Sequence, residues 1–224
     1  MNHMDIAHII TTVTVYALPV LLAITLHEAA HGYAALHWGD NTAQRLGRIS
    51  LNPLRHIDPL GTIAMPLLLY FATSGAFLFG YAKPVPVNFS RLHNPKRDMV
   101  WVALAGPASN WGQALCWAAL WLVLNAQAEP EAFFVQMAQA GVLVNLVMFA
   151  FNLFPLPPLD GGRILVGLLP MRLAIAVSRL EPYGFFIVMA LVLTGVVGGL
   201  WLRPLMAWTH WSIESVLWPL RALL

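Results

Sequence analysis

The sequence of 224 residues contains few charged side chains. Lys, Arg, Asp and Glu make up 10% of the chain, whereas hydrophobic residues make up 59%. A soluble domain carries about 25% charged residues, so this chain has too few to cover a water-facing surface. This scarcity excludes an ordinary soluble globule, and the abundance of apolar residues excludes a disordered chain. The composition predicts a compact polytopic membrane protein.

Cysteine is nearly absent as well. Cys116 is the only one, which excludes an internal disulfide, and its apolar surroundings predict a buried packing thiol. The formal net charge of +2 is too small for a nucleic-acid-binding surface. Residues 1–8 contain no Lys or Arg, so the sequence predicts no cleavable signal peptide.

Long apolar runs, in contrast, are plentiful. A membrane-spanning helix needs about 20 mostly apolar residues. Four segments meet this requirement, namely 9–36, 99–124, 133–154 and 183–202. The tail, 204–224, sets three tryptophans among polar residues, which predicts an interfacial helix because tryptophan favours the headgroup region of a bilayer. We therefore expect an all-α bundle of four core transmembrane helices, forming a single membrane-embedded domain over residues 1–224.

The basic residues predict how this bundle is oriented. Ten of the twelve Lys and Arg residues lie in three segments, 45–55, 83–97 and 163–179. By the positive-inside rule these segments face the cytoplasm, and the N-terminus lies outside. A fifth apolar stretch, 60–82, has basic residues beyond both of its ends, so both ends are expected on the cytoplasmic side. A re-entrant hydrophobic hairpin satisfies that rule, and a fifth crossing is the alternative.

The first span contains titratable residues that a membrane segment rarely tolerates. His27-Glu28-Ala-Ala-His31 forms the pattern H-E-x-x-H. Residues i and i+4 share a helix face, so both imidazoles can bind one metal ion. Glu28 is then placed to take a proton from a water whose pKa zinc lowers to about 7. A chance pattern is the alternative, but polar groups in an apolar span need compensation from one another or from a metal.

Asp160 is the expected third ligand. It follows Asn152-Leu-Phe-Pro-Leu-Pro-Pro-Leu, whose prolines cannot continue the third helix. Non-helical backbone is tolerated at membrane depth only where it is buried in protein or lines a wet cavity. Gly161 and Gly162 are expected to allow a tight turn and a close approach. Asp160 would complete a two-histidine, one-carboxylate zinc site with an open fourth position, although an ordinary turn aspartate is the alternative.

Three motifs occur in order on successive spans: His27-Glu-Ala-Ala-His31, Gly106-Pro-Ala-Ser-Asn110, and Asn152-x-x-Pro-x-Pro-x-Leu-Asp160-Gly161. Together they resemble the site-2 protease family of intramembrane zinc metalloproteases, peptidase family M50. The tract 80–88 is similar to the compact bacterial branch of that family, and the resemblance covers residues 9–202. It implies one Zn²⁺ ion held by His27, His31 and Asp160, with Glu28 as catalytic base and Asn152 assisting the oxyanion. No segment is long or polar enough for the PDZ or CBS domain that many relatives carry.

Two other asparagines and one loop complete the candidate residues. We expect Asn110 to support packing and the metal site rather than to act in catalysis, and Asn145 to make an inter-helix hydrogen bond. Residues 85–88 and the preceding Pro84 hold two prolines, Pro84 and Pro86. Two interpretations stay open for them: a plain cytoplasmic loop, or an edge strand that pairs with an unwound substrate.

The resemblance implies hydrolysis of a peptide bond within or near a transmembrane segment of a membrane protein. The expected location is a cell membrane, the bacterial inner membrane, with the active site toward the cytoplasm. The expected partners are a transmembrane protein substrate and the lipid bilayer, and a regulatory partner or a homo-oligomer stays open. The rival functions are a catalytically silent scaffold and a metal transporter. A transporter would need ligands on several facing spans, yet the second to fourth spans contain no histidine.

Overall fold

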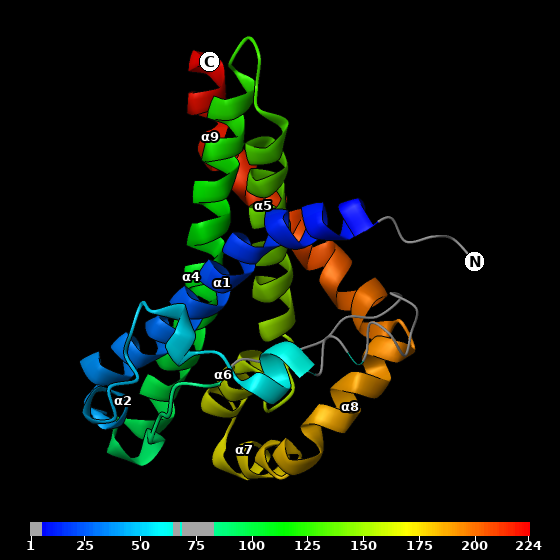
Figure 1. Cartoon of the computed structure of the whole chain (residues 1–224). Helices are drawn as coiled ribbons and strands as arrows, with labels where there is room; N and C mark the ends of the chain where they lie inside the picture. The colour runs from blue at the N-terminus through cyan, green and yellow to red at the C-terminus, as the bar shows by residue number, and fades with distance from the viewer. Residues whose placement is uncertain (1–5, 65–67, 69–82) are drawn as a thin grey trace.

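The protein is described by a computed structural model over residues 6–64, 68 and 83–224. All regular secondary structure in these ranges is helical, which confirms the all-α class (Figure 1). Most of the apolar stretch 60–82 lies outside the described residues, so the choice between hairpin and crossing stays a prediction. The elements are α1 (Ile6–His37), α2 (Thr42–Arg45), η1 (Pro53–Arg55), η2 (Pro59–Ala64), η3 (Phe89–Arg91), α4 (Pro95–Asn125), α5 (Ala132–Asn152), α6 (Asp160–Leu168), α7 (Met171–Ser178), α8 (Glu181–Leu193), η4 (Val197–Leu202) and α9 (Arg203–Leu223).

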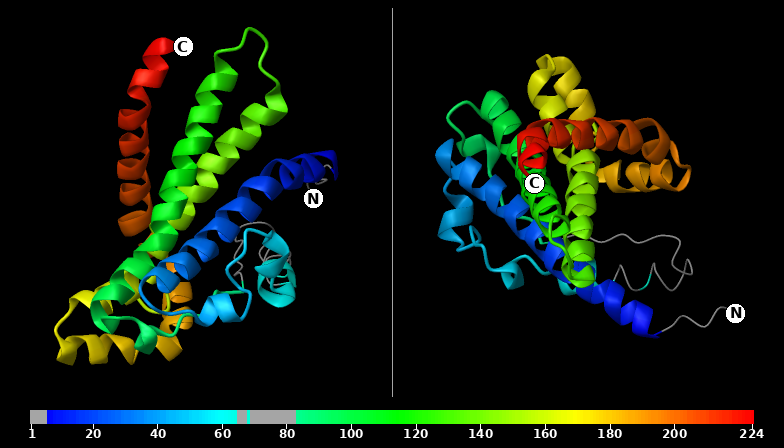
Figure 2. Two further views of the ribbon diagram at one scale, coloured as in Figure 1. Left: turned by 90° about the vertical axis from the view of Figure 1, so that its left-hand side faces the viewer. Right: turned by 90° about the horizontal axis from the view of Figure 1, so that it is seen from above.

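Three long helices form the centre of the molecule. Helices α4 and α5 lie side by side, and α1 crosses them obliquely (Figures 1 and 2). Small residues fill the space between these helices, and many of them are fully buried. Small side chains let helix backbones approach closely, which favours packing between helices inside a bilayer. The buried alanines of this core include Ala23, Ala35, Ala103, Ala114, Ala138, Ala140 and Ala150.

The number of membrane-capable helices is smaller than the sequence predicts. Among the described helices, α1 over Ile10–His37 and α5 are long and apolar enough to cross a membrane. Helices α7 and α8 make a third candidate if they count as one span, with a bend of 68° between them. The expectation of four core spans is therefore supported for 9–36 and 133–154 and stays a prediction for 99–124 and 183–202, because the bent pair α7–α8 begins twelve residues before the last of these.

The predicted span 183–202 is not one continuous α-helix. Helix α8 ends at Leu193, and Gly195 follows with a φ of 76°. Glycine adopts this left-handed conformation without a steric penalty and commonly ends helices in this way. The chain then continues through η4 into α9. A hydropathy profile does not reveal this break, because hydropathy describes the polarity of side chains and not the conformation of the backbone.

Helix α9 runs lengthwise beside α4, and its C-terminal end lies near the connection between α4 and α5 (Figure 2). The indole N–H of Trp111 donates to Ser212 Oγ over 3.0 Å. Ile213 is buried against Ala114 and Ala118 of α4. The tail is thus part of the helical packing, and its position at a membrane interface stays a prediction.

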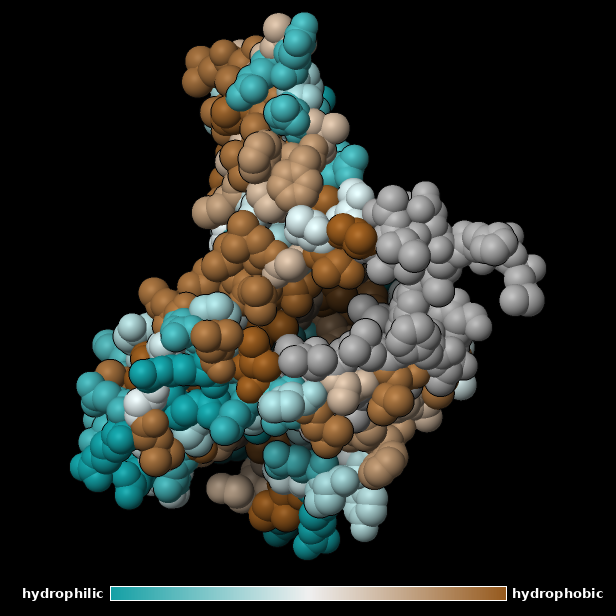
Figure 3. All heavy atoms as spheres, in the orientation of Figure 1, coloured by the Kyte–Doolittle hydropathy of each residue, from teal (hydrophilic) through white to brown (hydrophobic). Residues whose placement is uncertain are grey.

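The outer surface is apolar in its middle and polar toward its ends. Figure 3 shows hydrophobic residues over the centre of the visible face, with hydrophilic residues gathered near α2 and at the opposite end. Cys116 is exposed on α4, so the prediction of a buried thiol is wrong. An apolar segment of a membrane protein can turn a residue toward lipid as well as toward protein, so apolar sequence does not establish burial in protein.

Candidate metal centre

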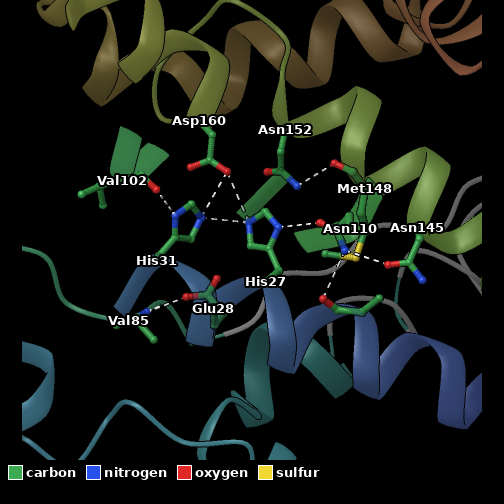
Figure 4. Close-up of polar contacts among 11 residues, drawn as sticks. His27, Glu28, His31, Val85, Val102, Asn110, Asn145, Met148, Asn152 and Asp160 are labelled. Atoms are coloured by element: carbon green, nitrogen blue, oxygen red, sulfur yellow. Dashed lines mark hydrogen bonds and ion pairs between the residues drawn. The ribbon is translucent and has the colours of Figure 1, made fainter. Parts of the chain in front are cut away.

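Two histidines of α1 and the first residue of α6 meet at one point (Figure 4). His27 Nε2 and His31 Nε2 are 3.0 Å apart, and each lies 3.3 Å from Asp160 Oδ2. His27 and Asp160 are buried, with exposed fractions of 5% and 7%. The three residues that the sequence predicts as ligands therefore come together as a cluster that can hold a metal ion.

The far side of each imidazole faces a hydrogen-bond acceptor. His27 Nδ1 lies 2.6 Å from Asn110 Oδ1, and His31 Nδ1 lies 2.7 Å from the carbonyl oxygen of Val102. Each Nδ1 therefore carries the proton and donates, which leaves the lone pair of each Nε2 directed at the centre of the cluster. Such hydrogen bonds commonly fix the tautomer of a metal-binding histidine.

When both imidazoles are neutral in this tautomer, their two lone pairs and a carboxylate oxygen face one another. Asp160 Oδ2 is buried and has no hydrogen-bond partner in the described part of the chain. The 3.3 Å contacts are therefore approaches of acceptors rather than hydrogen bonds, and a shared cation would satisfy all three. Zinc bonds of about 2.0–2.1 Å directed to the corners of a tetrahedron place neighbouring ligand atoms about 3.3 Å apart. The donor set and its spacing fit zinc.

Gly106 of α4 leaves room for this cluster. A Cβ atom at position 106 would lie 2.3 Å from His31 Nε2 and 2.6 Å from His27 Nε2. Both distances are far shorter than van der Waals contact, so a side chain here would displace the imidazoles. Gly106 opens the motif that ends at Asn110, but its position in the sequence did not predict this role.

The irregular segment after α5 places Asp160 beside the two histidines. Helix α5 ends at Asn152, the next seven residues are irregular, and α6 begins at Asp160, as the prolines predict. Gly161 and Gly162 lie in the first turn of α6 rather than in a separate tight turn, which corrects that part of the prediction. The expected close approach is confirmed, because a Cβ on Gly161 would lie 2.1 Å from the carbonyl oxygen of Leu153.

Glu28 lies at the edge of the cluster and is half-buried. Its Oε2 accepts a hydrogen bond of 2.6 Å from the backbone N–H of Val85, in the irregular segment 83–88 (Figure 4). This contact was not predicted. A backbone donor leaves no signal in the side-chain pattern, and the same is true of the Val102 carbonyl.

Asn152 lies beside Asp160 at the end of α5 (Figure 4). Its Nδ2 donates to the carbonyl oxygen of Met148 in the same helix over 3.0 Å. A carbonyl of its own helix therefore holds this amide, which lies next to the candidate metal ligand Asp160.

The comparisons with known proteins agree with this geometry. The sequence profile of peptidase family M50 matches residues 123–195. A protein of Bacillus subtilis (strain 168) named "Putative zinc metalloprotease YwhC" is 39% identical over 180 residues, which cover 78% of this chain and 78% of that protein. The chain belongs to peptidase family M50. This membership confirms the resemblance to the site-2 proteases.

More distant members of the M50 family are also similar to the chain. "Putative zinc metalloprotease Rip2" of Mycolicibacterium smegmatis (strain ATCC 700084 / mc(2)155) is 29% identical over 201 residues, covering 88% of this chain and 70% of that protein. Rip2 of Mycobacterium tuberculosis (strain ATCC 25618 / H37Rv) is 27% identical over 192 residues. No solved structure matches the chain.

Proposed function

We propose that this M50 protein is an intramembrane zinc metalloprotease, which hydrolyses a peptide bond within or near a transmembrane segment of a membrane protein. The observation that carries the proposal is the buried convergence of His27 Nε2, His31 Nε2 and Asp160 Oδ2, with a carboxylate on the residue next to His27. Similarity to proteins named as zinc metalloproteases supports the same metal and the same reaction class.

The chain's own residues have distinct roles in this proposal. His27, His31 and Asp160 hold the zinc ion, which when bound acts as a Lewis acid toward water and the scissile carbonyl. Glu28 takes the proton from the attacking water and passes it to the leaving amine. The Asn152 amide turns one N–H toward the carbonyl oxygen, where negative charge develops during attack.

The location follows from the basic residues and from the depth of the site. His31 lies six residues before the end of α1, and Arg45 and Arg48 follow shortly after it. We place this end of α1, and therefore the metal centre, toward the cytoplasmic side of a bacterial inner membrane. The whole chain acts as one membrane-embedded domain in this proposal.

The segment 83–88 supports an edge-strand role only in part. It has no regular secondary structure, and Glu28 and Asp40 accept the N–H groups of Val85 and Asn88. Pro84 and Pro86 have no N–H. Arg48 already donates to the carbonyl oxygens of Lys83 and Pro84. An unwound substrate would therefore find the N–H of Val87 open for pairing, and to pair with Val85 it would have to displace Glu28. A transmembrane helix must unwind before cleavage, because its amides are otherwise held in helical hydrogen bonds.

Comparative membrane proteomics tests the function. Cells lacking the native protein are complemented with the wild type or with Glu28→Gln, and membrane-embedded fragments are compared. We expect a substrate to accumulate with Glu28→Gln while the purified variant keeps its zinc. The candidate substrate and the purified protein are then placed together in liposomes. Cleavage by the wild type supports the proposal, and equal cleavage by Glu28→Gln contradicts the role of Glu28. Zinc uptake without cleavage would favour a transporter, and neither activity would favour a silent scaffold.

A further inference from the structure

A row of buried amides leads from the metal cluster into the core. His27 Nδ1 contacts Asn110 Oδ1 of α4, and Asn110 Nδ2 donates to Asn145 Oδ1 of α5 over 2.9 Å. Asn145 Nδ2 donates in turn to the carbonyl oxygen of Gly141 over 2.9 Å. Figure 4 shows Asn110 and Asn145 in line beyond His27. Both asparagines are fully buried, so water does not substitute for these partners.

The two ligand histidines differ in the group that accepts a hydrogen bond from Nδ1 and so fixes the tautomer. His31 faces the backbone carbonyl of Val102, which accepts a hydrogen bond and can never donate one. His27 faces a side-chain amide instead. Rotation of that amide by half a turn would exchange its oxygen for its NH₂ group. An NH₂ group at this position would require a lone pair on His27 Nδ1, which would move the proton to Nε2, where the metal binds.

Contacts on the other side of Asn110 prevent that rotation. Its NH₂ group faces two acceptors, Asn145 Oδ1 and, at 3.3 Å, the carbonyl oxygen of Ala23. The orientation of Asn145 is fixed because its own NH₂ group donates to the Gly141 carbonyl. Reversing Asn110 would set its oxygen against two acceptor oxygens in a buried site, and such unpaired groups are costly. The contacts between the Gly141 carbonyl and His27 therefore permit only one arrangement of donors and acceptors.

We infer that Asn145 is a positioning residue for the metal centre: acting through Asn110, it fixes the Nδ1–H tautomer of His27 and so presents the Nε2 lone pair to the zinc ion. Asn145 touches neither the ligand atoms nor the open position of the site. This inference rests on the zinc site of the proposed function, but it does not depend on proteolysis.

Zinc affinity and histidine protonation test the inference directly. Zinc affinity is measured by competition with a chelator on the purified full-length protein. The protonated ring nitrogen is identified by ¹⁵N NMR of the metal-free protein with labelled histidine. Loss of a hydrogen-bonding partner behind a metal ligand typically lowers metal affinity by about 10–100-fold. We expect a loss of that size for Asn145→Leu and for Asn110→Leu, with the His27 signal changing from Nδ1–H to Nε2–H. His56 serves as an internal reference, because its Nε2 faces the Ser50 carbonyl at 2.8 Å and carries the proton in every variant.

Two conservative variants separate hydrogen bonding from packing. Asn110→Asp keeps an acceptor for His27 Nδ1 but sets its second oxygen against Asn145 Oδ1 and the Ala23 carbonyl. We therefore expect it to retain the Nδ1–H tautomer of His27 and to be less stable than the wild type. Asn145→Asp keeps an acceptor for Asn110 and should retain the wild-type tautomer, which preserves the test if Asn145→Leu does not fold. Thr25→Val is the matched control, because Thr25 lies on α1, is buried, and has an Oγ1 without a hydrogen-bond partner in the described residues.

The outcomes separate this inference from the proposed function. Unchanged tautomer and zinc affinity in a folded Asn145→Leu variant would overturn the inference. An Nε2–H signal from His27 in Asn145→Asp would overturn it as well. A wild type that binds zinc with the expected tautomer but cleaves no membrane protein would contradict the proposed function and leave the inference intact.

Discussion

The backbone N–H of Val85 donates to Glu28 Oε2 over 2.6 Å, joining the loop 83–88 to the proposed catalytic base. The loop is itself anchored on both sides of this contact. Lys83 N–H donates to the His56 carbonyl over 2.9 Å, and Asn88 N–H donates to Asp40 over 2.6 Å. The position of the base therefore depends on the path of residues 83–88 as well as on α1.

Val85→Pro removes the donor to Glu28 and leaves the ligands untouched. We expect zinc content to stay at the wild-type level and cleavage to fall by about 10–100-fold, because small displacements of a reacting group cost that much. Val87→Pro is the matched control, since the N–H of Val87 makes no hydrogen bond in the described structure. Equal losses in the two variants would indicate a general effect of proline on the loop and not the loss of this contact.

Gly106→Ala should empty the metal site. The added methyl group would lie 2.3 Å from His31 Nε2, within the space where the ligands converge. We expect zinc bound per protein, measured by mass spectrometry, to fall below about a tenth of the wild-type value, consistent with the loss of ligand geometry. Gly112→Ala on the same helix is the control, because no atom lies within 4 Å of a Cβ at that position. That control should keep its zinc and gain stability of up to about 1 kcal/mol from helix propensity.

Removal of zinc should destabilise the wild type. A ligand that binds only the folded state at a free concentration 100 times its Kd contributes about 2.7 kcal/mol. We expect a chelator to lower the thermal midpoint of the purified wild type by several degrees, and zinc to restore it. Asp160→Ala, which lacks one ligand, should show a smaller response. The same response in both proteins would place the stabilising metal elsewhere.

Asp40, which follows α1, gives a prediction on pH. Burial raises the pKa of this carboxyl group, but hydrogen bonds from Thr42 and Asn88 and the charge of Arg91 outweigh burial and lower the pKa below its usual value. A group with a lower pKa in the folded state stabilises the fold above its unfolded pKa of about 3.9, and this contribution is lost as the pH falls below it. Asp40→Asn should therefore be less stable than the wild type at pH 6. The difference in thermal midpoint should shrink between about pH 4 and pH 3, and a constant difference would contradict this account.

Periodicity and composition predict most of the metal centre. His27 and His31 share a helix face by their spacing, and the prolines before Asp160 force the chain out of α5 at the depth of the histidines. Helix spacing and proline content are local properties of the chain, so both can be predicted from a single sequence. An inter-helix hydrogen bond of Asn145 was also predicted, because a buried amide in a helical bundle requires a partner, but the sequence did not identify Asn110 as that partner.

The remaining features depend on tertiary structure. The donor to Glu28 is a backbone N–H, which every residue except proline possesses. The break at Gly195 and the packing of α9 along α4 depend on the backbone conformation and on contacts between distant segments. The direction in which Asn110 presents its oxygen is fixed only by the order of neighbours in three helices.

The alanine-rich core has a consequence for how this protein must be handled. Small residues fill the interior, whereas large apolar side chains such as Phe134, Phe186 and Leu200 are 48%, 70% and 78% exposed. Much of the apolar surface is therefore covered by acyl chains and not by other parts of the protein. The stability measured for the purified protein will therefore include a contribution from the surrounding detergent. A change of detergent chain length should shift the thermal midpoint even when the sequence and the metal content are constant.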